Sequence, residues 1–337
     1  MTTSQPIRVA ILADSFTADP AGFLFPFLQA LRAELDEPIL VIAQEDPHPA
    51  VETIVQRQTE IDLVLVFLRF KCLYGNTALL RPISKPLVLI EHDACQNALP
   101  NSPYFGAWTK YLRNSPIRLT CVSGLTALRS LEDQGIPCLW LPKGAPETFL
   151  RKPYRTVGRF CLFGETRYGV YEHRRLVYDS IRPLTLHDRI ISRWKLFPYS
   201  YLADRLLRRR GVVHRIHFSY ADMPDVLKWY SGCIVCDQGL GEPMIKHFEA
   251  SALGLAVFRD SDSVQELEQL GYRDGVSMIV YENKEDLREK IGHYGRHLSE
   301  LAAVQAAGRT AAQRNTWEIR AAKLVNYLQE RFGPPLV

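Results

Sequence analysis

Nearly continuous apolar runs alternate with amphipathic segments along the first half of the chain. The apolar runs carry charges mainly at their ends, whereas residues 23–35 repeat apolar positions at helical spacing. Strands that are buried on both faces have this pattern, so we expect a parallel sheet with helices on both sides. The expected strands are residues 7–14, 61–68, 86–93, 118–124 and 137–144.

The alternation starts again after residues 146–157, a segment with two prolines and little periodicity. We therefore expect an α/β protein with two Rossmann-like domains, residues 1–150 and 151–315, whose parallel sheets face each other across a cleft. A final amphipathic helix, within residues 316–337, ends before a Gly-Pro-Pro sequence. Ligands of such sheets bind at the carboxyl ends of the strands. The expected strands of the second domain are residues 158–165, 212–218, 232–237, 255–260 and 277–282.

Composition and charge narrow the class of ligand. The chain has 337 residues, 47% hydrophobic and 23% charged, which is ordinary for a globular protein with two cores. Residues 1–150 hold 12 Lys and Arg against 15 Asp and Glu, net −3, and residues 151–337 hold 29 against 22, net +7. The second half therefore suits an anionic small molecule or an anionic surface better than the first.

The seven scattered cysteines indicate reduced thiols and a cytoplasmic setting. Cys233 and Cys236 have C-x-x-C spacing, but they lie on an expected strand, where positions three apart point to opposite faces. The first residues do not have the pattern of a signal peptide, and no apolar run is long enough to span a bilayer.

Residues 242–260, EPMIKHFEASALGLAVFRD, combine a polar first half with a small and apolar second half. We expect a helix from about Pro243 to Leu253, whose free N–H groups would attract phosphate or a sugar oxygen. Lys246 and Glu249 are three residues apart and so lie on nearly the same face. The small residues after them allow the helix to pack closely on its sheet.

This stretch resembles the signature of group 1 glycosyltransferases of the B fold (GT-B), and more closely their spore-maturation-type branch. The resemblance implies that Glu249 binds the ribose hydroxyls of a nucleotide-sugar donor and that Lys246 lies near the diphosphate. Residues 160–181 resemble the first strand, the Phe-x-Gly turn and the Arg-bearing helix of that family's second domain. Residues 122–150 and 314–328 resemble its last N-domain unit and its closing helix, which returns towards the N-terminal domain.

The sequence also departs from the family pattern. Many group 1 enzymes carry two Glu separated by seven residues, but the position eight before Glu249 is Gly241, and the nearest carboxylate is Glu242. Either the loop shifts by one residue or the role of the first Glu is absent. We take Glu242 as a catalytic candidate. The donor-binding candidates are Glu249, Lys246, Arg174, Arg175, Gly164, Tyr220, Pro243 and Met244.

His92 is the other catalytic candidate, because it follows an apolar strand, where a parallel sheet presents catalytic groups. Asp93 or Glu91 would orient its ring, and a capping histidine is the alternative. Further cleft candidates are Asp14, Ser15 and Gly22, after the first strand, and Arg167. The segment around them lacks a G-x-G-x-x-G fingerprint, so a dinucleotide cofactor is not expected.

No metal is expected. His293 and His297 are four residues apart on a helix without an evident third ligand, and Asp260-Ser261-Asp262 is interpreted as a turn. The resemblance implies a glycosyltransferase that uses a nucleoside-diphosphate sugar, needs no cofactor, and acts on a glycan, lipid-linked, protein or small-molecule acceptor. Three alternatives stay open: a nucleotide-sugar epimerase, a non-catalytic sugar-nucleotide-binding protein, and an adaptor that binds a membrane surface through basic residues 204–215. Nucleic acid is a less expected partner.

Overall fold

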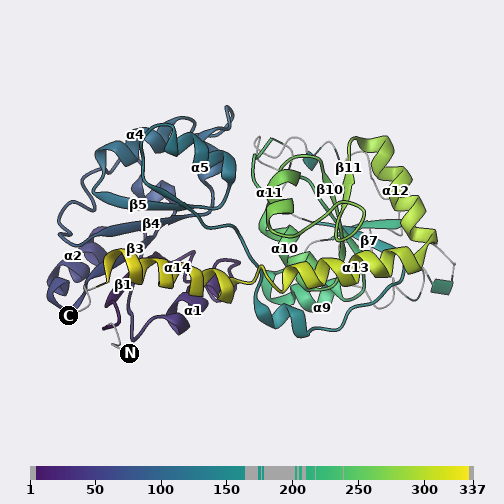
Figure 1. The fold of residues 1–337 in the computed structure, drawn as a ribbon, viewed down its shortest axis with the longest axis horizontal. Coiled ribbons are helices and arrows are strands. Elements are labelled where there is room, and N and C mark those ends of the chain that lie inside the picture. Colours follow the sequence, from purple (N-terminus) through teal and green to yellow (C-terminus); the bar gives the residue numbers. More distant parts are fainter. Residues whose placement is uncertain are drawn as a thin grey trace. The chain divides into compact units, whose positions relative to one another are not determined.

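The computed structural model divides the chain into two compact units, each built around a parallel sheet (Figure 1). One unit comprises Met1–Pro142 and Trp317–Val337, and the other comprises Lys143–Thr316. The structure describes residues 5–163, 174, 175, 177, 202, 205, 206, 210–216, 218–237 and 239–333.

The first unit has a six-stranded sheet in the order β2-β1-β3-β4-β5-β6, and its neighbouring strands pair in parallel. The strands are β1 (Val9–Asp14), β2 (Ile39–Ala43), β3 (Leu63–Phe67), β4 (Leu87–Glu91), β5 (Ile117–Val122) and β6 (Cys138–Trp140). The helices are α1 (Phe25–Glu34), α2 (His48–Gln56), α3 (Phe70–Leu73), α4 (Ala107–Asn114), α5 (Leu125–Glu132) and α14 (Trp317–Phe332), with 3₁₀ turns η1 (Gln58–Glu60) and η2 (Ala94–Asn97).

The second unit has a five-stranded parallel sheet in the order β11-β10-β9-β7-β8. The strands are β7 (Arg159–Leu162), β8 (Val212–Arg215), β9 (Gly232–Val235), β10 (Ala256–Asp260) and β11 (Ile279–Tyr281). The described helices are α9 (Met223–Leu227), α10 (Ile245–Ala252), α11 (Val264–Gln269), α12 (Lys284–Arg296) and α13 (Leu298–Ala312), with 3₁₀ turns η3 (Glu147–Arg151) and η5 (Tyr220–Asp222).

Burial follows the apolar runs of the sequence. Every residue of β1, β3 and β4 is buried, as expected for strands covered on both faces. The sheet of the second unit has one apolar cluster on each face, and Cys233 belongs to one cluster while Cys236 belongs to the other. The two thiols therefore diverge as predicted, and all seven cysteines are unbridged.

The boundary between the two units falls before residue 143, because residues 143–150 pack in the second unit. The sequence pattern placed these residues in the first domain, but they pack in the second unit, where Ala145 pairs with Thr316 and Phe149 joins the core. The last helix, α14, packs beside α1 of the first unit, in yellow and purple (Figure 1). No helix among the described residues is long and apolar enough to cross a membrane.

Candidate functional site

The helix α10 begins two residues later than the sequence predicts. Its N-cap is Met244, with extended backbone, so Pro243 precedes the helix instead of lying in its first turn. The physical reason is Asp237, whose Oδ2 accepts the Met244 N–H at 3.1 Å and holds it outside the helix. The loop before it turns at Gly239 and Gly241, both with positive φ.

The carboxylate of Glu249 is buried and incompletely bonded. Its side chain is 1% exposed, and Oε1 has no hydrogen-bond partner among the described residues. Burial raises the pKa of Glu249 to about 7, against the opposing effects of the nearby Tyr220 hydroxyl and of Lys246. Tyr220, on η5, lies close to this carboxylate without hydrogen-bond geometry, and its own pKa is raised by burial and by Glu249. A buried acceptor of this kind suits a ligand hydroxyl.

Two cationic side chains lie near the same helix. Lys246 donates from Nζ to the carbonyl of Phe163, which follows β7, at 3.1 Å. Burial first, and the Arg174 guanidinium second, lower the pKa of Lys246 to about 7. Arg174 is itself buried and donates from Nη2 to the carbonyl of Cys236, after β9, at 3.5 Å. These two cations repel each other beside the carboxyl ends of the adjacent strands β7 and β9. An anion bound between them would relieve this repulsion.

Glu242 forms a buried ion pair that sequence analysis missed. The Nζ of Lys143 lies 2.5 Å from Oε1 of Glu242, and the two side chains are 3% and 1% exposed. Lys143 Nζ also lies 4.0 Å from the Met244 sulfur. Because the two partners are 99 residues apart, no local pattern links them. The only signal was that Lys143 falls inside the Pro-x-Gly turn after an expected strand.

A second buried charge network holds the loops around Asp237. Arg259, on β10, is fully buried, and its Nη1 and Nη2 lie 3.7 Å from Asp237 and 3.6 Å from Asp260. Asp260 accepts the backbone N–H of Asp237, and Asp262 accepts that of Gly239. The Asp-Ser-Asp sequence is thus a turn, as predicted, and its carboxylates fix the loop that leads to Glu242 and α10.

His92, in the first unit, lies directly after β4 within an aromatic cluster. Its ring centroid is 5.5 Å from those of Phe27, Phe67 and Trp317. Its backbone carbonyl accepts a hydrogen bond from Ser123 Oγ at 3.1 Å. The ring is 5% exposed, so it is part of a packed core, and its proposed role in proton transfer stays a prediction.

The other candidates of the first unit have structural contacts. Asp14 Oδ2 accepts hydrogen bonds from the backbone N and Nε of Arg69, and Oδ1 accepts one from Thr17 N. Ser15 is exposed. Gly22 lies in a tight turn, where a Cβ would be only 3.1 Å from two backbone carbonyl oxygens. Asp93 is exposed, and its N–H donates to Glu91 Oε1 at 2.7 Å.

Of the remaining candidates in the second unit, the structure describes one and leaves two outside the described residues. Arg175 is helical and exposed, unlike its buried neighbour Arg174. Gly164 and Arg167 lie outside the described residues, as does much of the basic segment 204–215. The structure therefore brings together the donor-binding candidates Glu249, Lys246, Arg174 and Tyr220. A fifth, Met244, is the N-cap of the same helix, and Glu242 lies in the loop before it.

Comparisons with known proteins bear on the family and the fold of the chain. A family model described as glycosyl transferase-like matches residues 150–326, which include α10, Glu242 and the network around Arg259 but not Lys143. No curated protein matches the chain significantly.

Solved structures share the two-unit fold at low identity. Anabaena HepE in complex with UDP-glucose aligns with a TM-score of 0.66 at 13% identity, over 96% of this chain and 100% of HepE. Sucrose-phosphate synthase from Thermosynechococcus elongatus aligns with 0.64 at 12%, over 96% and 99%. A glycosyltransferase from Rickettsia africae aligns with 0.59 at 10%, over 97% and 98%. The fold is therefore that of GT-B glycosyltransferases.

Proposed function

Because the chain belongs to the glycosyl transferase-like family, we propose that it transfers a sugar from a uridine-diphosphate sugar to an acceptor without a metal cofactor. In this reaction the bond between the anomeric carbon and the diphosphate breaks. A bond between that carbon and an acceptor atom forms, and the acceptor loses a proton. Support for uridine comes from HepE, which was solved with UDP-glucose.

The observation that carries the proposal is the incomplete bonding of Glu249. Folding buries a carboxylate oxygen without a described partner, which is costly unless a ligand supplies the missing hydrogen bond. An ionised carboxylate accepts from two donors at once, and the adjacent hydroxyls of a ribose are two such donors. Glu249 is therefore proposed to bind the ribose of the donor.

The diphosphate is proposed to lie against Lys246, Arg174 and the first turn of α10. The first N–H groups of a helix have no partner within it, and they attract an anion. When the anomeric bond breaks, negative charge accumulates on the leaving diphosphate, and fixed cations stabilise that charge. Together these groups take the role that a divalent metal has in other transferases, which supports metal-independent transfer.

Glu242 is proposed to contribute to the sugar end of the donor. Its pairing with Lys143 keeps one carboxylate oxygen fixed beside Met244, at the entry to α10. The departure from the two-Glu spacing of the family then reflects a loop in which Gly239 and Gly241 re-aim the carboxylate.

The test is a calorimetric titration of UDP and 2′-deoxy-UDP into wild type and Glu249→Gln. The amide offers one acceptor oxygen instead of two, so we expect UDP affinity to fall about tenfold to a hundredfold, at 1.4 kcal/mol per factor of ten. The variant should also discriminate less between the two nucleotides. Glu268→Gln, an exposed carboxylate on α11, is the matched control and should bind as wild type does. Unchanged UDP affinity in Glu249→Gln would refute the donor assignment.

A second measurement separates an enzyme from a binding protein. Release of UDP from UDP-sugars, by transfer or slow hydrolysis, is expected from wild type with EDTA present. Binding without any release, across a panel of UDP-sugars and acceptor sugars, would contradict the proposed transfer while leaving the donor site intact.

A further inference from the structure

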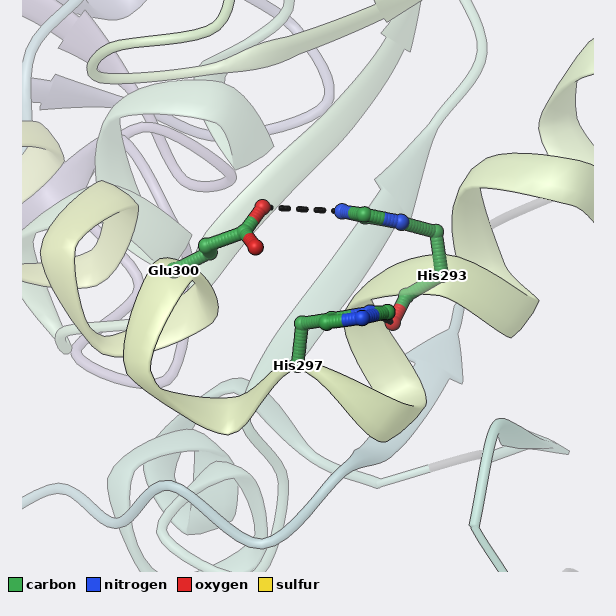
Figure 2. Close-up of side chains that lie close together, drawn as sticks. All are labelled: His293, His297 and Glu300. Carbon is green, nitrogen blue, oxygen red and sulfur yellow. Dashed lines mark hydrogen bonds and ion pairs between the residues drawn. The ribbon is translucent and has the colours of Figure 1, made fainter.

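The break between α12 and α13 brings three metal-binding side chains together. The helix α12 ends at Arg296 and α13 begins at Leu298, so His297 is the C-cap of one and the N-cap of the other. Its φ of −100° and ψ of 71° turn the chain between the two helices. His293 lies in the last turn of α12, and Glu300 lies in the first turn of α13 (Figure 2). Glu300 is the third residue that helical spacing alone did not reveal.

Figure 2 shows the side chains of His293 and Glu300 directed at each other, with the ring of His297 alongside that of His293. One ligand atom from each of His293, His297 and Glu300 lies within 4.8 Å of the others. The two imidazole rings stack with centroids 4.2 Å apart and planes 20° apart. His293 Nε2 is 2.8 Å from Glu300 Oε2. The three ligand atoms are thus close enough to share one ion once the ring of His293 rotates out of this stack.

A backbone hydrogen bond prepares His297 as a ligand. Its Nδ1 lies 2.8 Å from the carbonyl oxygen of His293. A carbonyl oxygen only accepts, so Nδ1 carries a proton, and in the neutral ring the lone pair is on Nε2. Histidines that bind metals usually donate their other ring N–H to a carboxylate or carbonyl in this way. The chain thus fixes both the tautomer and the orientation of this ring.

We propose that His293, His297 and Glu300 bind one zinc-type divalent transition-metal ion that clamps α12 to α13. Two imidazoles and one carboxylate suit Zn²⁺ and its neighbours Co²⁺ and Ni²⁺, whereas Mg²⁺ and Ca²⁺ prefer oxygen ligands only. The side chains of His293 and Glu300 are 43% and 54% exposed, so water has access to the fourth position. The metal replaces the proton that His293 shares with Glu300.

The electrostatic setting favours a cation. Both histidines lie at the C-terminal, negative end of the α12 dipole, and the carboxylate of Glu300 lies at the N-terminal, positive end of the α13 dipole. The site is separate from the donor-binding candidates, and its metal has no part in the proposed transfer.

The position of the clamp gives it a structural role. The helix α13 packs on α10 and β10, and Gln305 donates from Nε2 to the carbonyl of Gly254 at 2.7 Å. Fixing the angle between α12 and α13 therefore stabilises the helix layer that supports α10. The effect is expected in the stability of the fold and not in the chemistry of transfer.

The experiment uses the full chain, stripped with EDTA and titrated with Zn²⁺ against a chelator of known affinity. We expect saturation at one equivalent per chain, and binding at least tenfold weaker in both Glu300→Gln and His297→Gln. Two matched controls, Glu289→Gln on the exposed face of α12 and His48→Gln in the first unit, should bind within about twofold of wild type. Co²⁺ absorption in the visible range should likewise be lost in His297→Gln.

Two outcomes would overturn the proposal. One is the absence of saturable binding to the wild type. The other is wild-type affinity in both variants, which would place the bound ion at thiols instead. Because all substituted side chains are at the surface or half-exposed, circular dichroism of each variant should confirm that the fold is kept.

Discussion

At the scale of single residues, two charged groups of α10 have perturbed surroundings: a carboxylate that lacks one hydrogen-bond partner within the described part of the chain and an amine that lies near a second cation. Among the described residues, Glu249 Oε1 has no hydrogen-bond partner, and Lys246 lies near the guanidinium of Arg174. Sequence spacing correctly placed these two residues three apart on one helix. It could not show that burial brings both of their pKa values to about 7, because burial depends on segments distant in the sequence. The chemistry of this helix is therefore set by tertiary packing.

The lowered pKa of Lys246 predicts that UDP binding is coupled to proton uptake. The folded pKa of about 7 lies below the ordinary 10.5, so this amine opposes folding fully below pH 7 and progressively less as the pH rises from 7 to 10.5. At pH 8 the free protein holds it mostly neutral. A bound diphosphate favours the charged amine and raises its pKa. At pH 8 we expect uptake of up to about one proton, detected as a binding enthalpy that differs between Tris and phosphate buffers.

Lys246→Met is the matched variant for this measurement. It should bind UDP more weakly and with an enthalpy that no longer depends on the buffer through this group. Identical buffer dependence in wild type and Lys246→Met would show that the amine is already charged in the free protein, or that the diphosphate does not lie beside it.

At the scale of elements, strands were easier to predict than the positions where loops and helices begin. Continuous apolar runs identified β1, β3 and β4, because strands buried on both faces need them. The strand β2 was missed because it is an edge strand, mostly half-buried, with Ile42 42% exposed. The start of α10 was placed two residues early, because the bond from the Met244 N–H to the Asp237 carboxylate, seven residues earlier in the same loop, has no local sequence signal.

The network around Arg259 predicts a large difference between buried and exposed ion pairs. Arg259→Met should lower the free energy of unfolding by about 3–5 kcal/mol, because Asp237 and Asp260 stay buried without their cation. Urea denaturation measures the change. The combined variant Arg259→Met with Asp237→Asn should be less destabilised than the sum of the two single variants.

Arg288→Met is the control, since Arg288 and Glu285 form an exposed pair at 3.7 Å. Exposed pairs of this kind contribute about 0–1 kcal/mol. If Arg259→Met and Arg288→Met lowered the free energy of unfolding equally, the network around Arg259 would not be an essential support of the loop between β9 and α10.

At the scale of the whole molecule, the repeated alternation of strands and helices predicted two Rossmann-like units, and the resemblance of residues 242–260 to group 1 glycosyltransferases implied the GT-B fold. The pairing of Lys143 with Glu242 was not predictable, because only the folded chain brings residues 99 positions apart together. The same is true of the His293, His297 and Glu300 cluster, which depends on a helix break that the amphipathic pattern does not contain. The periodicity of apolar residues thus predicts the topology of the chain, whereas the geometry of its sites depends on contacts between residues distant in the sequence.

The last helix illustrates how the ends of the chain form one unit. Trp317 begins α14 and is fully buried, with its ring centroid 4.8 Å from that of Phe27 on α1. Trp317→Ala removes most of a buried aromatic side chain, which costs about 3–5 kcal/mol in a core that collapses only partly. We therefore expect hydrogen exchange in Val9–Glu34 to accelerate strongly.

The same variant should leave exchange in β9 and β10 near the wild-type rate, because these strands belong to the other unit. Trp229→Ala provides the reciprocal control. Its half-buried ring packs on Arg155 and against the core of the second unit, so exchange should accelerate there and not in β1 or α1. If Trp317→Ala accelerated exchange equally in both units, α14 would stabilise the molecule as a whole, and the assignment of residues 317–333 to the first unit would have no energetic meaning.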